Sequence, residues 1–265
     1  MRIAIGIDFN GRAYRGWQTQ QPGVKSVQET LERAIARVAD HSVIVHAAGR
    51  TDAGVHAAGM IAHFDTDALR PARSWMLGVN THLPDDIALR WVTPVSDDFH
   101  ARFRAVARRY RYVIYNHAFR SSLLAGMVTW HYHALDLARM QAAARHLVGT
   151  HDFTSFRAVA CQAPKPVRHV HFLELRQKGP FIVLDIQADG FLHHMVRNIA
   201  GVLMAIGQGK AEPGWAAEVL AARDRTLGGV TAPPEGLYFV DALYPEQFLL
   251  PRDNPPGPAF LHGVY

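Results

Sequence analysis

The sequence predicts an α+β fold, and three observations lead to this prediction. Several segments alternate apolar and polar residues with the period of a half-buried strand, and others repeat apolar residues at helical spacing. Both halves of the chain carry these segments in the order β-α-β-β-α-β. A chain of 265 residues, 49% of them hydrophobic, is also long enough to bury a core in each half. We therefore expect two ferredoxin-like halves whose sheets join, with an active-site cleft between them.

The first half, residues 1–105, begins with a strand over residues 2–9, in which isoleucine recurs at alternate positions. Ser26 is followed three residues later by Glu29, the pattern of a capping box, and this predicts a helix over residues 27–38. The remaining elements expected in this half are strands over residues 41–47, 60–64 and 86–93 and a short helix opened by Pro71.

The second half, residues 106–265, repeats the pattern. It opens with a long strand over residues 106–115, and Asp136 caps a helix that ends before Gly149. The other expected elements are a hairpin of strands over residues 167–177 and 181–189, helices over residues 192–206 and 215–222, and a last strand over residues 236–243. From Pro245 onward the chain is rich in Pro and Gly and is expected to wrap the surface.

The charge of the chain favours a nucleic-acid partner. Its formal net charge is +5, and most of its basic residues are arginine, which forms forked contacts with phosphate and stacks on bases. Genomic base composition explains a high arginine content equally well, so the distribution of the arginines decides. The single cysteine, Cys161, excludes an internal disulfide and a cysteine-rich zinc site. Neither a signal peptide nor a membrane-spanning stretch is visible, so we expect a cytoplasmic protein.

The stretch from Gly49 to Ala57 is the first candidate for chemistry. It holds Asp52 in a predicted tight turn, with Arg50 two residues before it and His56 four residues after it. Such a turn can fix a single carboxylate against a substrate. It can also be an ordinary solvated β-turn, in which Asp is favoured for its hydrogen bonds to the backbone.

The densest basic stretch of the chain is the second candidate. Guanidinium groups beside aromatic rings suit a phosphate backbone and an unstacked base. The alternative is an edge strand that its arginines keep soluble. The arginines of this stretch are Arg102, Arg104, Arg108, Arg109 and Arg111, and they are interleaved with Phe103, Tyr110 and Tyr112.

A third candidate lies on the most apolar helix expected in the second half. Arg197 falls beside its buried stripe and needs an anionic partner, for which a carboxylate of the other half is the obvious candidate. His193 and His194 are expected to pack or to face solvent, since no metal-binding spacing accompanies them. Phosphate-loop, dinucleotide and nucleophile-elbow patterns are not found in the sequence, and nothing in it demands a metal or cofactor.

These stretches together resemble the tRNA pseudouridine synthase A family, over nearly the whole chain and in the same order. The residues that carry the resemblance are Gly49–His56, Tyr14–Gln18, Asp98–Arg102, Ala107–Tyr112, Asp152–Phe156, His193–Asn198 and Glu235–Tyr238. The resemblance implies an enzyme that converts uridine to pseudouridine at positions 38, 39 and 40 in the anticodon stem-loop of tRNA. It also implies a homodimer that works without metal or cofactor.

The resemblance assigns a role to each site residue. Asp52 matches the catalytic aspartate, which acts as a nucleophile or as a base at the sugar. Arg50 matches the residue linked to base extrusion, Tyr110 the tyrosine that stacks on the target base, Arg197 the arginine that pairs with the aspartate, and Leu237 the apolar wall of the pocket. Apart from the resemblance, the density of arginines in the basic stretch leads us to expect that they contact the RNA backbone. A non-catalytic tRNA-binding or folding factor and a nucleoside hydrolase remain as alternatives.

Overall fold

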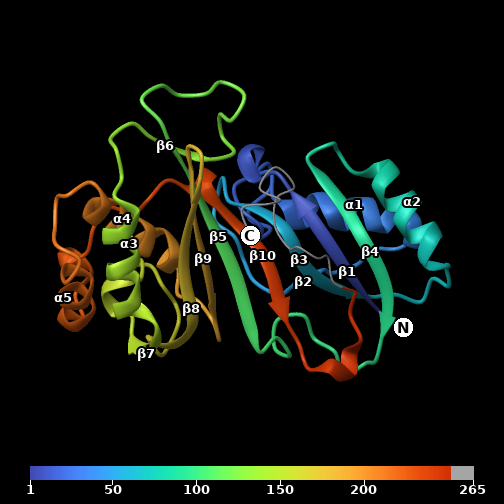
Figure 1. Cartoon of the computed structure of the whole chain (residues 1–265). Helices are drawn as coiled ribbons and strands as arrows, with labels where there is room; N and C mark the ends of the chain where they lie inside the picture. The colour runs from blue at the N-terminus through green and yellow to red at the C-terminus, as the bar shows by residue number, and fades with distance from the viewer. Residues whose placement is uncertain (252–265) are drawn as a thin grey trace. The chain divides into compact units, whose positions relative to one another are not determined.

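The structure is a computed structural model that describes residues 1–251, and in this range the chain forms two compact units. Unit 1 contains Met1–Val106 together with residues 238–251, and unit 2 contains Ala107–Leu237. Figure 1 labels their helices and strands along the chain. The α+β class is confirmed. The strand predicted over residues 236–243 as the last one of the second half falls almost wholly in unit 1. Most of the tail expected to wrap the surface lies outside the described residues.

Unit 1 contains a sheet with the strand order β4-β1-β3-β10, and β2 also pairs with β3. Strand β1 is antiparallel to both β3 and β4. The first six strands and helices, β1 to β4 with α1 and α2, follow the predicted β-α-β-β-α-β order. The elements are β1 (Arg2–Phe9), α1 (Val27–Ala39), β2 (His46–Ala47), β3 (His56–Asp65), α2 (Ala72–His82), β4 (Ile87–Val95) and β10 (Leu237–Leu243).

Two strands, β2 and β10, pair with opposite ends of β3. Near its end it pairs with β2 through His63 and His46, and near its start it pairs in parallel with β10 through His56 and Tyr238. The strand expected over residues 41–47 is therefore much shorter than predicted. The pairing of β10 brings the segment after Leu237 onto the strand that follows the Asp52 loop.

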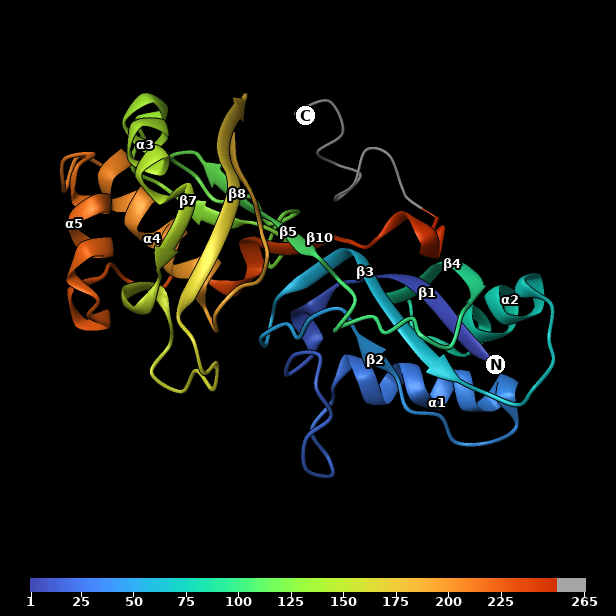
Figure 2. The same ribbon diagram turned by 90° about the horizontal axis from the view of Figure 1, so that it is seen from below.

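The helices of unit 1 lie against one face of its sheet, as Figure 2 shows from below. Helix α1 begins as the capping pattern predicts, because the Ser26 hydroxyl accepts a hydrogen bond from the Glu29 amide at 3.3 Å. The Glu29 carboxylate forms an ion pair with Arg33 at 3.1 Å. Leu31 and Ile35 of α1 are fully buried. This core fixes the sheet edge from which the Asp52 loop projects.

Unit 2 contains the strand order β5-β9-β8-β7, with β6 pairing in parallel with β5. The predicted hairpin is confirmed as β8 and β9, which meet at Lys178 and Phe181. Strands β6 and β7 are too short to show a period and were not predicted. The elements are β5 (Ala107–Asn116), β6 (Thr129–His131), α3 (Leu137–Ala144), β7 (Gly149–Asp152), β8 (Val167–Lys178), β9 (Phe181–Ala188), α4 (Met195–Gly207) and α5 (Trp215–Ala222).

Helix α4 begins at Met195, three residues later than the apolar pattern predicts. His194 precedes it with a φ of 62°, in the left-handed region, and ends the run of helical backbone there. His193 is therefore not on the helix. Within residues 1–251 no helix is long and apolar enough to cross a membrane.

Candidate functional site

Asp52 lies in the loop between β2 and β3, and its side chain is half-buried. The Val55 amide donates to the Asp52 carbonyl at 3.1 Å and closes a tight turn. Gly54 occupies this turn with a φ of 78°, a conformation that glycine adopts without strain. Arg50, just before the turn, is exposed. Gly54 therefore has a defined geometric role in the Asp52 turn.

The segment after β1, residues 14–17, holds the Asp52 loop through hydrogen bonds between backbone groups. The Trp17 amide donates to the Thr51 carbonyl at 3.1 Å, and the Gly54 amide donates to the Tyr14 carbonyl at 3.3 Å. Gly16, between these two contacts, has a φ of 95° and lies against the Thr51 carbonyl. The residues before and after Asp52 are thus both held by this segment, so the position of the carboxylate depends on it.

Two sets of side-chain contacts hold the segment after β1 in place. The buried Tyr14 ring donates its hydroxyl hydrogen to Asp86, and both burial and this hydrogen bond raise the pKa of Tyr14. At the other side, the Gly11 amide donates to Nδ1 of the buried His56 at 3.0 Å, and His56 stacks on Tyr238 with a centroid distance of 4.7 Å. His56 is therefore part of the support of the loop.

Tyr110 lies in the middle of β5, opposite Ile186 of β9, and is 9% exposed. Its ring meets the edge of Phe191 at a centroid distance of 5.0 Å and an angle of 82°. Tyr112, two residues on, is fully buried, and its hydroxyl lies 2.6 Å from the Thr129 hydroxyl oxygen. Burial raises the pKa of Tyr112. Phe191, which sequence reasoning missed, packs directly against Tyr110.

The arginines of the basic stretch fall in different surroundings. Arg109 forms a fork on Asp185, with both hydrogen bonds at 2.7 Å, and Arg111 reaches the same carboxylate at 2.9 Å. Arg111 is only 2% exposed. Arg108 is half-buried, whereas Arg102 and Arg104 of unit 1 are exposed. Arg109 and Arg111 thus both turn to the Asp185 carboxylate of β9.

Arg197 lies in the first turn of α4 and is half-buried. Its Nε donates to the Ala232 carbonyl at 2.8 Å, and the Ala232 amide donates to the Arg197 carbonyl at 3.1 Å. The neighbouring Asn198 is buried and accepts a hydrogen bond from Thr231 at 2.7 Å. These bonds tie α4 to the segment that leads into β10, at whose start the buried Leu237 lies.

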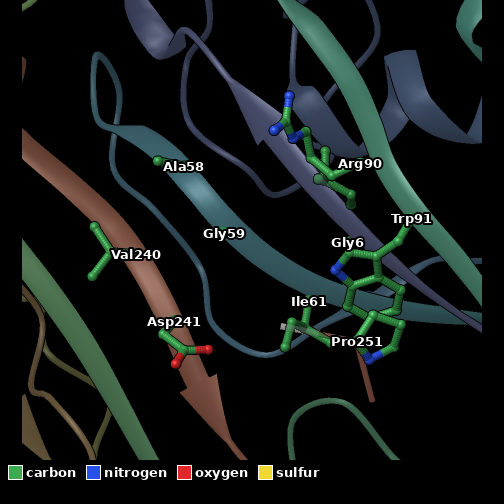
Figure 3. A pocket seen from close by; sticks show the side chains of 10 residues that line it. Gly6, Ala58, Gly59, Ile61, Arg90, Trp91, Val240, Asp241 and Pro251 are labelled. Atoms are coloured by element: carbon green, nitrogen blue, oxygen red, sulfur yellow. The ribbon is translucent and has the colours of Figure 1, made fainter. Parts of the chain in front are cut away.

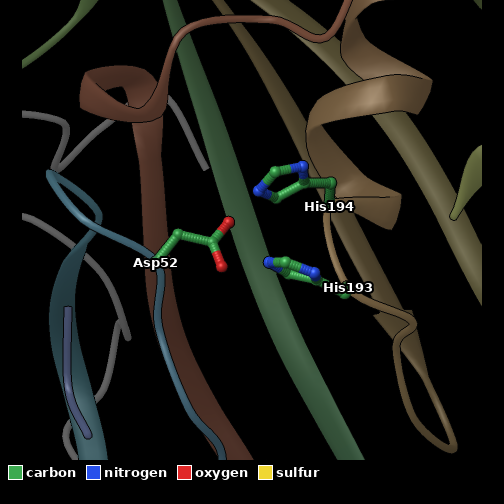
Figure 4. Close-up of side chains that lie close together, drawn as sticks. All are labelled: Asp52, His193 and His194. Carbon is green, nitrogen blue, oxygen red and sulfur yellow. The ribbon is translucent and has the colours of Figure 1, made fainter. Parts of the chain in front are cut away.

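Figure 4 draws the side chains of Asp52 from unit 1 and of His193 and His194 from unit 2. His193 is exposed and His194 is half-buried, and their rings lie 4.1 Å apart at the start of α4. The two histidines therefore pack on each other where α4 begins.

A cavity of unit 1 does not suit a nucleotide. It lies between Gly6, Gly59 and Trp91 and has a volume of about 20 Å³ (Figure 3). That is room for a single water molecule.

Comparison with known proteins decides the family. A family model described as tRNA pseudouridine synthase matches residues 6–104 and 143–245. The protein named tRNA pseudouridine synthase A from Alcanivorax borkumensis is 58% identical over 260 residues, which cover 98% of this chain and 97% of that protein. The chain belongs to the tRNA pseudouridine synthase A family.

Two further members of the tRNA pseudouridine synthase A family agree. The protein of this name from Acinetobacter baumannii (strain AYE) is 56% identical over 261 residues, 98% of each chain. The one from Acinetobacter baylyi is 55% identical over 261 residues, covering 98% of this chain and 96% of that protein. The resemblance found in the sequence is thus confirmed, and with it the enzyme class, an isomerase.

Proposed function

We propose that this chain converts uridine to pseudouridine at positions 38, 39 and 40 in the anticodon stem-loop of tRNA, with Asp52 as the catalytic residue. The observation that carries the proposal is the Asp52 loop. It is gripped on both sides by the segment after β1, through the bonds of Thr51 and Gly54. A carboxylate held by such a support is suited to act on one atom of a substrate.

The reaction requires one carboxylate. The bond between N1 of the base and C1′ of the ribose breaks, a bond forms between C5 and C1′, the hydrogen of C5 leaves, and N1 gains a proton. Asp52 either attacks C1′ or removes a proton from the sugar. Because the base stays in the site and is rejoined, the second carboxylate of glycoside hydrolysis is not needed.

A uridine in a stem must first leave its stack. Extrusion costs roughly a few kcal/mol, and we assign Arg50, exposed beside the loop, to hold the extruded state. Stacking of the base on Tyr110 would return about 1 to 3 kcal/mol. In this proposal Arg197 pairs with Asp52, and Leu237 forms the apolar wall for the same uridine.

The proposal gives the arginines of the basic stretch to the RNA backbone. Arg102 and Arg104 are exposed and present guanidinium groups directly. Arg108 and Arg109 keep part of their side chains accessible on β5. Arg111 is buried against Asp185, so its contribution is indirect, through the placement of Arg109.

We further propose that the enzyme is a cytoplasmic homodimer that holds one tRNA across both subunits. The support for this part is the family resemblance. Sedimentation of the protein with and without tRNA measures the subunit number and the stoichiometry, and a monomer that binds and modifies tRNA at full rate would contradict the dimer.

The decisive experiment incubates the purified protein with an unmodified tRNA transcript and maps pseudouridines by mass spectrometry. We expect pseudouridine at positions 38, 39 or 40, wherever the transcript carries uridine, and none with Asp52→Asn. Free uracil in place of pseudouridine would indicate a hydrolase. Retained tRNA binding without product, for the unaltered protein, would indicate a non-catalytic binding factor.

A further inference from the structure

The turn that follows β4 presents a phenylalanine to solvent. Phe103 is 74% exposed, although the turn around it is well anchored. Phe99 and Ala101, within the same turn, are fully buried. An isolated exposed apolar residue is ordinary on a protein surface. Phe103 differs because its large ring is held toward solvent by an ordered turn, and this exposure adds nothing to the hydrophobic core.

The support beneath Phe103 is a set of packed rings. The Phe103 ring lies 4.4 Å from the His100 ring, which lies 4.6 Å from the buried His63 ring. His63 Nδ1 accepts a hydrogen bond from the Ala101 amide at 3.2 Å. The Tyr244 hydroxyl donates to the Ala101 carbonyl at 2.6 Å. The orientation of Phe103 is thus set from below by buried groups.

Hydrogen bonds within the turn add to this rigidity. His100 Nδ1 accepts from the Arg102 amide at 3.1 Å, and the Arg104 amide donates to the His100 carbonyl at 2.9 Å. The turn is already ordered in the folded protein. The entropic cost of immobilising the Phe103 ring against a stacked ligand is therefore small.

Guanidinium groups flank the ring on both sides in the sequence. The Arg102 guanidinium lies 5.7 Å from the centre of the Phe103 ring, within the range of a cation–π contact. Arg104 is exposed and donates from Nε to the Asp98 carbonyl at 3.0 Å, with its Nη2 3.9 Å from the Asp98 carboxylate. The guanidinium groups of Arg102 and Arg104 are therefore close enough to the ring to contact the phosphates of a nucleotide stacked on it.

We infer that Phe103 is a stacking platform for an unpaired nucleobase of the bound RNA, apart from the target uridine, with Arg102 directed at the adjoining phosphates. This rests on the proposed function, in which the substrate is tRNA. An exposed aromatic ring combined with a cation is the arrangement by which proteins bind single-stranded nucleotides without reading their sequence.

A second copy of the chain is the competing occupant of this surface. Stable dimer interfaces bury about 800 Å² on each partner around a core depleted of charge. Phe103 is a single ring whose neighbours include Arg102, Arg104 and Asp98, all exposed. The charge of the surroundings favours a nucleotide.

The test measures the Kd of the full-length protein for an unmodified tRNA transcript. Phe103→Ala is expected to weaken binding by roughly 5- to 150-fold, the range of base–aromatic stacking. Phe103→Leu, which keeps an apolar side chain without a ring, is expected to resemble Phe103→Ala, and Phe103→Trp to bind as well as the unaltered protein. Arg102→Gln is expected to lower the slope of log Kd against log salt by about 1, whereas Phe103→Ala leaves it unchanged.

Phe119→Ala is the matched control, because Phe119 of unit 2 is 77% exposed and its removal deletes a similar ring. Its Kd should stay within about twofold. Phe103→Ala with unchanged tRNA binding, an equal loss in Phe119→Ala, or a change in subunit number by sedimentation would each overturn the inference. The proposed function is judged separately by pseudouridine formation with the unaltered protein, so the two can fail independently.

Discussion

Gly16 and Thr51 lie in backbone contact. A Cβ atom placed on Gly16 would lie 2.6 Å from the Thr51 carbonyl oxygen, and Gly16 also has a φ of 95°. Gly16→Ala must therefore strain the backbone and push against the residue just before Asp52. We expect unfolding to become easier by about 1 kcal/mol or more. Because displacement of a catalytic group by about 1 Å can cost 100-fold, kcat for pseudouridine formation should fall by about that factor.

Gly23→Ala is the control for this change. Gly23 has a similar φ of 89°, but a Cβ there would meet nothing within 4 Å. It should lose about 1 kcal/mol of stability in urea unfolding, from the backbone strain alone and so less than Gly16→Ala, with kcat unchanged. Equal kcat values for the two variants would mean that the contact with Thr51 does not position Asp52.

Asp185 forms ion pairs with two arginines on β5. Asp185→Asn leaves the guanidinium groups of Arg109 and the buried Arg111 without their shared carboxylate. Loss of one partner from a buried ion pair costs about 3 to 5 kcal/mol. We expect urea unfolding to show a decrease in the free energy of unfolding close to that range.

An exposed pair provides the comparison for Asp185. Arg2 and Asp65 form the same two-bond fork, with both distances 2.8 Å, but the Asp65 side chain is 62% exposed. Asp65→Asn should therefore cost less than about 1 kcal/mol. If the two variants lose the same stability, burial does not govern the strength of these pairs.

His63 should make the protein less stable in mild acid. Burial, with the nearby charges of His100, Arg2 and His46, lowers the pKa of His63 to about 3. In the unfolded chain His63 takes up a proton below about pH 6.5, whereas in the folded protein it stays neutral. Lowering the pH from 6.5 toward 3 thus favours unfolding, by up to about 1.4 kcal/mol per pH unit. Urea unfolding between pH 7 and 5 measures this slope.

His63→Asn removes the titrating group and keeps an acceptor for the Ala101 amide. Its free energy of unfolding should depend less steeply on pH below 6.5 than that of the unaltered protein. His100, whose pKa is also lowered by burial, remains in both proteins and cancels in the comparison. Identical slopes would show that His63 is protonated equally in both states.

Tyr110→Phe separates stacking from proton transfer. The ring and its edge contact with Phe191 are kept, so the tRNA Kd should stay within about twofold. Filter binding measures Kd, and mass spectrometry measures product. Retained product assigns stacking alone to Tyr110, and loss of product at unchanged Kd assigns proton transfer at C5. A Kd raised tenfold would contradict the expectation that the hydroxyl plays no part in binding.

Local patterns predicted most of the elements. The isoleucine alternation of β1, the Ser26 cap of α1 and the hairpin of β8 and β9 all depend on neighbouring residues, and all are confirmed. The parallel pairing of β10 with β3 joins residues far apart in the sequence, so no local period reveals it. The late start of α4 depends on the single left-handed residue His194.

The candidate site divides in the same way. The Asp52 turn and the basic stretch that enters β5 could be predicted, since glycine and charge are visible in the sequence. The supports could not be predicted, because they act through main-chain contacts and buried packing: Gly16 on Thr51, Gly11 on His56, and Phe191 on Tyr110. Asp185, the partner of Arg109 and Arg111, shows in the sequence only as a charge within an apolar strand.

The central claim is that Asp52 drives the exchange of the C5 hydrogen for the ribose. Release of tritium from tRNA carrying 5-tritiated uridine measures that exchange directly. The unaltered protein should release tritium in step with pseudouridine formation, and Asp52→Asn, which keeps the size of the side chain without its charge, should release none. Undiminished release by Asp52→Asn would contradict the account.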